Sequence, residues 1–174
     1  MNNYNYQPAV EAALASSAVV PKQTYLMWAQ EGDLGTQGRA YELSARAWDR
    51  IQPEPTMQEQ CGFMASYLLT CLATNPESDE WVHSGFEAGH ELASWLKHLV
   101  KRANADEVVI PVASEIERLY RVADAAGRNR IETGALEHIL ESRALRAYFK
   151  HWAEDDVLRK GHQLSLEWGI AHGE

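Results

Sequence analysis

The residues best suited to chemistry in this chain are histidines and carboxylates on one predicted helix. His83, Glu87, His90 and Glu91 stand at positions i, i+4, i+7 and i+8, so a helix would place them along one face. Glu87 and His90 form a Glu-x-x-His pair of the kind that supplies two ligands to di-iron sites in helical bundles. Such sites need a second copy and two further carboxylates, which this spacing alone does not supply. A zinc or iron site stays open, but a polar helix surface is favoured, and we expect no metal ion and no cofactor.

Nucleophilic catalysis is not indicated by local spacing, because no Ser/His/Asp or Cys/His grouping can be assembled from neighbouring residues. If the chain is an enzyme, we expect His90 with Glu87, or His138, to act as general base, because an imidazole titrates near neutral pH. The sequence leaves open whether any reaction is catalysed.

The charge balance restricts the class of partner. The 174 residues include 25 acidic and 16 basic side chains, which gives a formal net charge of -9. This balance argues against nucleic acid and against an anionic membrane surface as partners. The N-terminal stretch lacks the positive residues of a secretory signal, and no apolar run approaches the roughly 20 residues of a membrane span, so we expect a cytoplasmic protein.

Helical periodicity dominates the chain, and the alternation that marks strands is almost absent. Asn104, Asp106 and Pro111 interrupt the pattern and predict a hinge at 103–111. We therefore expect an all-α fold with an N-terminal part, 1–103, and a C-terminal part, 104–174, in one compact unit. The predicted helices cover residues 8–19, 22–30, 37–51, 57–73, 81–103, 111–124, 132–141, 143–157 and 164–172.

A twelve-residue frame, 124–135, separates two apolar helix faces. Asp124 stands at its first position and Ile131 at its eighth, as in a calcium-binding loop between helices. Positions three, five and twelve, where oxygen ligands belong, hold Ala126, Arg128 and Ala135. Calcium requires six to eight oxygen ligands, so we expect this segment not to bind it.

The frame and its flanking helices resemble an EF-hand. Around it the chain is similar to four-hand sarcoplasmic calcium-binding proteins, their bacterial relative calerythrin and aequorin-type photoproteins. A second such frame runs from Ala29 to Ala40 and also lacks the end ligands; weaker ones precede Phe86 and follow Trp152. The resemblance implies two pairs of degenerate helix-loop-helix hands packed into one domain. It also implies short β-bridges between paired loops, at Thr36 with Trp81 and at Ile131 with Leu164.

Six Trp and seven Tyr are many for a helical chain of this size. Core packing explains most such residues, but the resemblance to photoproteins implies an interior cavity that binds a small apolar or aromatic molecule. The function expected first is therefore a calcium-independent carrier of such a molecule, or an enzyme of specialised metabolism. The candidate ligand-binding residues are Trp28, Tyr41, Trp48, His90, Trp95, His138 and Trp152.

Two other functions stay open. The chain could be a calcium-independent adaptor that clasps a partner helix, as EF-hand sensors do. One degenerate loop could also retain weak calcium binding. The segment around Trp28 has some features of a tetratricopeptide helix pair, but no 34-residue period recurs.

Overall fold

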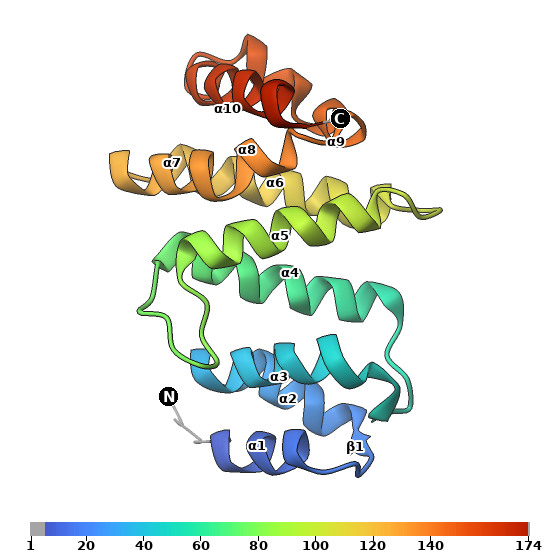
Figure 1. The fold of residues 1–174 in the computed structure, drawn as a ribbon. Helices are drawn as coiled ribbons and strands as arrows, with labels where there is room; N and C mark the ends of the chain where they lie inside the picture. Colours follow the sequence, from blue (N-terminus) through green and yellow to red (C-terminus); the bar gives the residue numbers. More distant parts are fainter. Residues whose placement is uncertain (1–5, 174) are drawn as a thin grey trace. The chain divides into compact units, whose positions relative to one another are not determined.

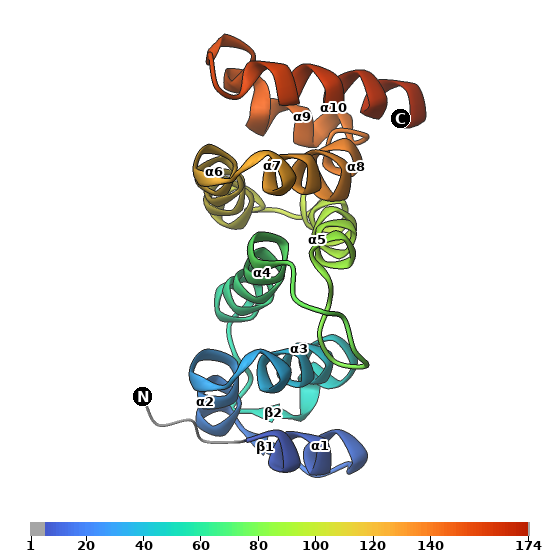
Figure 2. The same ribbon diagram turned by 90° about the vertical axis from the view of Figure 1, so that its left-hand side faces the viewer.

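The computed structural model describes residues 6–173 and confirms the all-α fold (Figure 1). In this part of the chain the strands are a two-residue parallel pair, β1 (Val20–Pro21) and β2 (Ile51–Gln52) (Figure 2). None of its helices is long and apolar enough to cross a lipid bilayer. The α-helices are α1 (Gln7–Ala15), α2 (Lys22–Glu31), α3 (Leu34–Ala47), α4 (Met57–Thr74), α5 (Gly85–Leu99), α6 (Asp106–Val122), α7 (Ala125–Ile131), α8 (Glu137–Ile139), α9 (Arg143–Phe149) and α10 (Arg159–His172).

Three tighter or wider helical segments complete the architecture. The segments Trp48–Arg50 and Lys150–Glu154 are 3-10 helices. The segment Glu132–Leu136 is a π-helix that joins α7 to α8, and the three run on as one rod (Figure 1). π-helical turns inside α-helices occur frequently at functional sites.

The chain forms two compact units, and their boundary differs from the predicted one. The first contains residues 6–67 and 77–83, and the second contains residues 68–76 and 84–173. The predicted hinge at 103–111 lies inside the second unit, because α5 and α6 both belong to it.

The core of the first unit is centred on Tyr25. Its ring packs edge-on against Trp48 and Phe63, with centroid distances of 5.9 and 5.4 Å, and its hydroxyl lies 3.0 Å from Ser44 Oγ. A glycine lets the loop backbone approach α3. A Cβ added at Gly38 would lie only 1.8 Å from the carbonyl oxygen of Trp81.

The core of the second unit depends on a close helix crossing. A Cβ added at Gly89 of α5 would lie 2.5 Å from the carbonyl oxygen of Gly134 in the π-helix. The start of α5 is fixed by a capping box, in which Ser84 accepts from the Glu87 N–H and the Glu87 carboxylate accepts from the Ser84 N–H. These features fix the α5 side chains that follow Glu87 relative to the π-helix.

The predicted interruption between the helices 111–124 and 132–141 is wrong, because α7 occupies residues 125–131 and the π-helix continues from Glu132. Asp124 is the N-cap of α7, and its carboxylate accepts a 2.7 Å hydrogen bond from the Gly127 N–H. The alanines that follow favour a helix, and the segment lacks the ligand oxygens that would hold it open around an ion. An acidic residue that precedes a helix has the same sequence signature as the first ligand of a loop.

A similar correction applies to the frame at 29–40, where the interruption is predicted between the helices 22–30 and 37–51. Only Gly32 and Asp33 separate α2 from α3, and Asp33 is the N-cap of α3, accepting from the Thr36 N–H at 2.8 Å. Within residues 6–173, the expected bridges are replaced by the pairing of Val20 with Ile51 and of Pro21 with Gln52. The predicted helix 81–103 begins only at Gly85, because the Asp79 carboxylate accepts the N–H groups of Trp81 and Val82.

Candidate functional site

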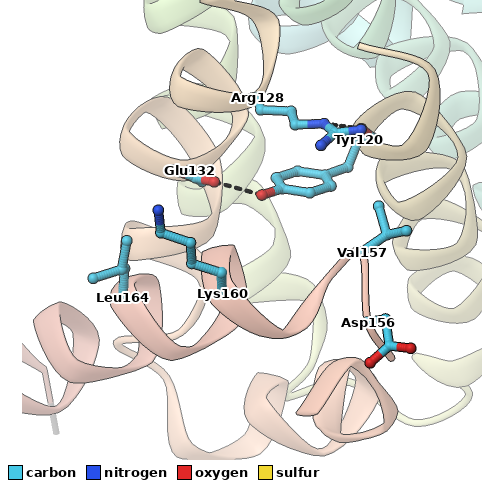
Figure 3. A pocket seen from close by; sticks show the side chains of 7 residues that line it. All are labelled: Tyr120, Arg128, Glu132, Asp156, Val157, Lys160 and Leu164. Atoms are coloured by element: carbon cyan, nitrogen blue, oxygen red, sulfur yellow. Dashed lines mark hydrogen bonds between the residues drawn. The ribbon is translucent and has the colours of Figure 1, made fainter. Parts of the chain in front are cut away.

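A pocket of about 550 Å³ opens in the second unit, at the end of α6 (Figure 3). Its walls come from α6, α7, the start of the π-helix and the region that begins α10. Both charged and apolar side chains line it. The lining residues are Tyr120, Arg128, Glu132, Asp156, Val157, Lys160 and Leu164.

The side chains of Tyr120 and Glu132, joined by a hydrogen bond, form the floor of the pocket. The Tyr120 hydroxyl donates to Glu132 Oε1 at 2.5 Å. Burial and then the Glu132 carboxylate raise the pKa of Tyr120 to about 12, so the phenol keeps its proton at neutral pH. Gly161 of α10 packs directly on this pair, since a Cβ there would lie 2.3 Å from the Tyr120 hydroxyl and 2.6 Å from Glu132 Oε1. The contact holds α10 against the floor.

The two cations of the pocket differ in what holds them. Arg128 lies over the Tyr120 ring, with its Cζ 5.3 Å from the ring centroid, and donates to the carbonyl oxygens of Tyr120 and Arg121. Lys160 is exposed and has no hydrogen bond or ion pair with any residue in the described part of the chain. In Figure 3 its side chain extends from α10 toward the side of the pocket that holds Glu132. Lys160 is therefore the cation available to a ligand.

A second group of polar rings lies between α5, α8 and α10. The rings of His90 and His138 are 4.2 Å apart, centroid to centroid, at an interplanar angle of 75°. His138 also packs edge-on against Trp168 at 4.8 Å, and Trp168 stacks on His172 at 4.2 Å. Partial burial, and then the charge of His138, lower the pKa of His90, which keeps its imidazole neutral at pH 7.

A carboxylate orients this group. Glu141 Oε1 lies 3.0 Å from His138 Nδ1, and the other carboxylate oxygen forms an ion pair with Lys97 of α5. Burial alone would raise the pKa of Glu141, but the bonds from Lys97 and His138 outweigh it and lower the pKa. An ionised carboxylate only accepts hydrogen bonds, so His138 donates from Nδ1, and the neutral form of this ring has its lone pair on Nε2.

Of the predicted site residues, the structure places the rings of His90 and His138 in contact. His90 and His138 meet, whereas Glu87, the predicted partner of His90, forms the capping box of α5. Trp28, Tyr41 and Trp48 belong to the first unit and Trp95 and Trp152 to the second. Trp28, Tyr41 and Trp152 are buried, and Trp48 and Trp95 are half-buried.

The pocket residues were not among the predicted ligand-binding side chains. In the sequence Tyr120 is part of an apolar helix face, and Glu132 is a lone carboxylate in an apparent loop. Lys160 and Leu164 are four residues apart, so a helix places this cation and this apolar side chain next to each other on one face. This local pattern could have indicated part of the site.

Within residues 6–173 no three His, Cys, Asp or Glu side chains are grouped so that they could hold a metal ion together. Comparison with known proteins found no matching family model, no similar curated protein and no similar solved structure.

Proposed function

We propose that the protein binds a small molecule with an apolar or aromatic body and an anionic group in the pocket of the second unit. The observation that carries this proposal is the unpaired Lys160 ammonium beside the apolar side chains of Val157 and Leu164. These two are 41% and 49% exposed, so a ligand that covers them gains hydrophobic free energy. Lys160 supplies a point charge for a carboxylate or phosphate.

The floor of the pocket adds a second polar contact. One oxygen of Glu132 accepts from Tyr120, and the other has no hydrogen-bond partner in the part of the chain that is described. A ligand with a hydroxyl or amine that reaches this oxygen would satisfy it. The proposed ligand class is therefore an apolar or aromatic acid that also carries a hydrogen-bond donor. No calcium ion takes part in this binding.

The experiment is a thermal-shift and calorimetric screen with aromatic acids such as indole-3-acetate, 4-hydroxybenzoate and tryptophan. Lys160→Gln should weaken binding of a hit about tenfold or more, because a charge-assisted hydrogen bond contributes about 1.5–3 kcal/mol. Lys150→Gln is the matched control, since Lys150 is also exposed and lies outside the pocket. Equal weakening by both variants would show non-specific attraction and contradict the proposal.

A partner helix is the competing occupant, because Val157 and Leu164 are also exposed apolar residues of the kind that a helix could cover. Native mass spectrometry of the protein purified from its expression host separates the two. A retained mass of a few hundred daltons that is lost in Leu164→Asp supports the small molecule. A retained polypeptide that is lost in the same variant supports the helix.

A further inference from the structure

Two histidines far apart in the sequence meet on one surface of the second unit. We propose that His90 and His138 together bind a borderline divalent transition-metal ion, such as Zn²⁺, Ni²⁺ or Cu²⁺, with water completing its coordination. The site shares no residue with the pocket and does not depend on the proposed function. Its two ligands come from α5 and α8, so no pattern on a single helix reveals it.

The backbone holds the two ligands in place. Gly89, next to His90, lies where α5 crosses the π-helix at Gly134. The two helices approach so closely there that a Cβ on Gly89 would overlap the Gly134 backbone. His138 follows Gly134 by one turn of the same rod. The backbone positions of the two histidines are therefore fixed before an ion arrives, which lowers the entropic cost of chelation.

The hydrogen bond of His138 prepares its free nitrogen. Metal-binding histidines almost always donate their other ring N–H to a carboxylate or carbonyl, which fixes the tautomer and raises the basicity of the ligating nitrogen. Glu141 has this role toward His138 Nδ1 and leaves Nε2 as the metal-binding atom. Lys97 binds the other oxygen of Glu141, so this carboxylate orients the ligand.

The second ligand adapts to the ion. The two rings are nearly perpendicular, so the lone pairs converge only after the His90 ring turns. His90 is exposed, and no hydrogen bond holds its ring within the described residues. The same exposure lets the ion enter and lets water fill the remaining coordination positions. Imidazole nitrogens suit Zn²⁺, Ni²⁺ and Cu²⁺, whereas Ca²⁺ and Mg²⁺ prefer oxygen.

The test is isothermal titration calorimetry of the full chain with ZnCl₂ and NiCl₂. The wild type should bind one ion, and His90→Gln and His138→Gln should each weaken binding about 100-fold or more, because even outer carboxylates contribute about 10–100-fold. Glu141→Gln should weaken it about tenfold. His98→Gln is the control, since His98 is exposed on the same helix, where its Nδ1 contacts the Ser94 carbonyl.

Trp168 provides a second readout because it contacts His138. Cu²⁺ should quench part of the tryptophan fluorescence, and Trp168→Phe should remove that part while the calorimetric affinity for Zn²⁺ stays unchanged. His90 is exposed, so His90→Gln keeps its fold, which far-UV circular dichroism checks. No Zn²⁺ binding by the wild type, undiminished binding by His90→Gln, or equal weakening by His98→Gln would each overturn the proposal.

Discussion

The segments 25–48 and 115–140 have the same sequence signature, yet they fold differently. Each has an aspartate before a helix, and each aspartate is an N-cap: Asp33 for α3 and Asp124 for α7. The helix that Asp33 starts is regular for fourteen residues. The helix that Asp124 starts changes after seven residues into the π-helix at Glu132.

The change in helix type has a chemical consequence. In the first segment the buried Tyr25 hydroxyl has a neutral partner, Ser44, whose own oxygen also donates to backbone carbonyls. In the second, the Tyr120 hydroxyl is bonded to the carboxylate of Glu132 at the floor of a pocket. On α3 the neutral Ser44 hydroxyl completes its hydrogen bonds within the core, whereas the π-helix presents the charged Glu132 carboxylate at the pocket.

The largest predicted effect concerns the glycines of the two segments. Gly38→Ala should destabilise the protein by about 3 kcal/mol, because the new Cβ meets the Trp81 backbone and the loop must move. Gly134→Ala should change stability by less than about 1 kcal/mol, since its nearest neighbour is the Phe86 ring at 3.3 Å and the gain in helix propensity offsets the contact. Urea denaturation measures both.

Gly62→Ala is the control for these two variants, because nothing lies within 4 Å of the new Cβ and Gly62 is exposed on α4. It should stabilise the protein by about 1 kcal/mol. An equal loss of stability in Gly38→Ala and Gly134→Ala would contradict the prediction, because it would show that α3 and the π-helix have the same space for an added Cβ.

The second prediction compares the two tyrosines. Tyr120→Phe should cost about 2 kcal/mol and Tyr25→Phe about 1 kcal/mol, because a hydrogen bond to a charged acceptor contributes more than one to a neutral acceptor. The measurement is again urea denaturation at pH 7. The reverse order would mean that the Glu132 carboxylate contributes nothing beyond a neutral acceptor.

The pH dependence of Tyr120 sharpens the same comparison. Its pKa is raised from 10.0 to about 12, so its contribution to stability is complete below pH 10 and is lost as the pH rises toward 12. Tyr120→Phe should therefore show a smaller loss of stability between these pH values than the wild type. Burial also raises the pKa of Tyr25, so this tyrosine adds to the loss in both proteins.

The sequence predicted the helical class correctly because long apolar faces at helical spacing determine it, as in α6 with Ile116, Leu119 and Tyr120. It did not predict the breaks, since an aspartate N-cap and a first loop ligand look alike. The π-helix has no compositional signal of its own. The site depends on contacts between distant segments, such as Gly161 on Tyr120 and His90 on His138, which no local pattern contains.

The third prediction tests the role of the two aspartates. Asp33→Ala and Asp124→Ala should each cost about 1 kcal/mol, the usual effect of losing an N-cap, whereas Asp33→Asn and Asp124→Asn should cost little. Differential scanning calorimetry measures the shifts. Asparagine variants as unstable as the alanine variants would show that charge, and not capping, explains both aspartates.

Acid provides an independent check on Asp33. Burial would raise the pKa of its carboxyl, but hydrogen bonds from Thr36 and Gln7 and the charge of Arg39 lower it below its ordinary 3.8. Its contribution to stability is therefore present above that value and is lost as the pH falls through the lower pKa of the folded state. Asp33→Asn should remove this part of the acid-induced loss of stability.

The smallest predicted effect is the response to calcium, which should be absent. Millimolar CaCl₂ should leave the Tm and the tryptophan fluorescence as they are in chelator, because the oxygens that a loop would offer are already engaged. Asp33 and Asp124 each accept a backbone N–H at a helix start, and the residues between Asp124 and Glu132 form a helix that cannot wrap an ion. Ions bound only by the folded state raise Tm. A calcium-dependent increase in Tm would therefore require an ion-binding loop, which the segments 25–48 and 115–140 both lack.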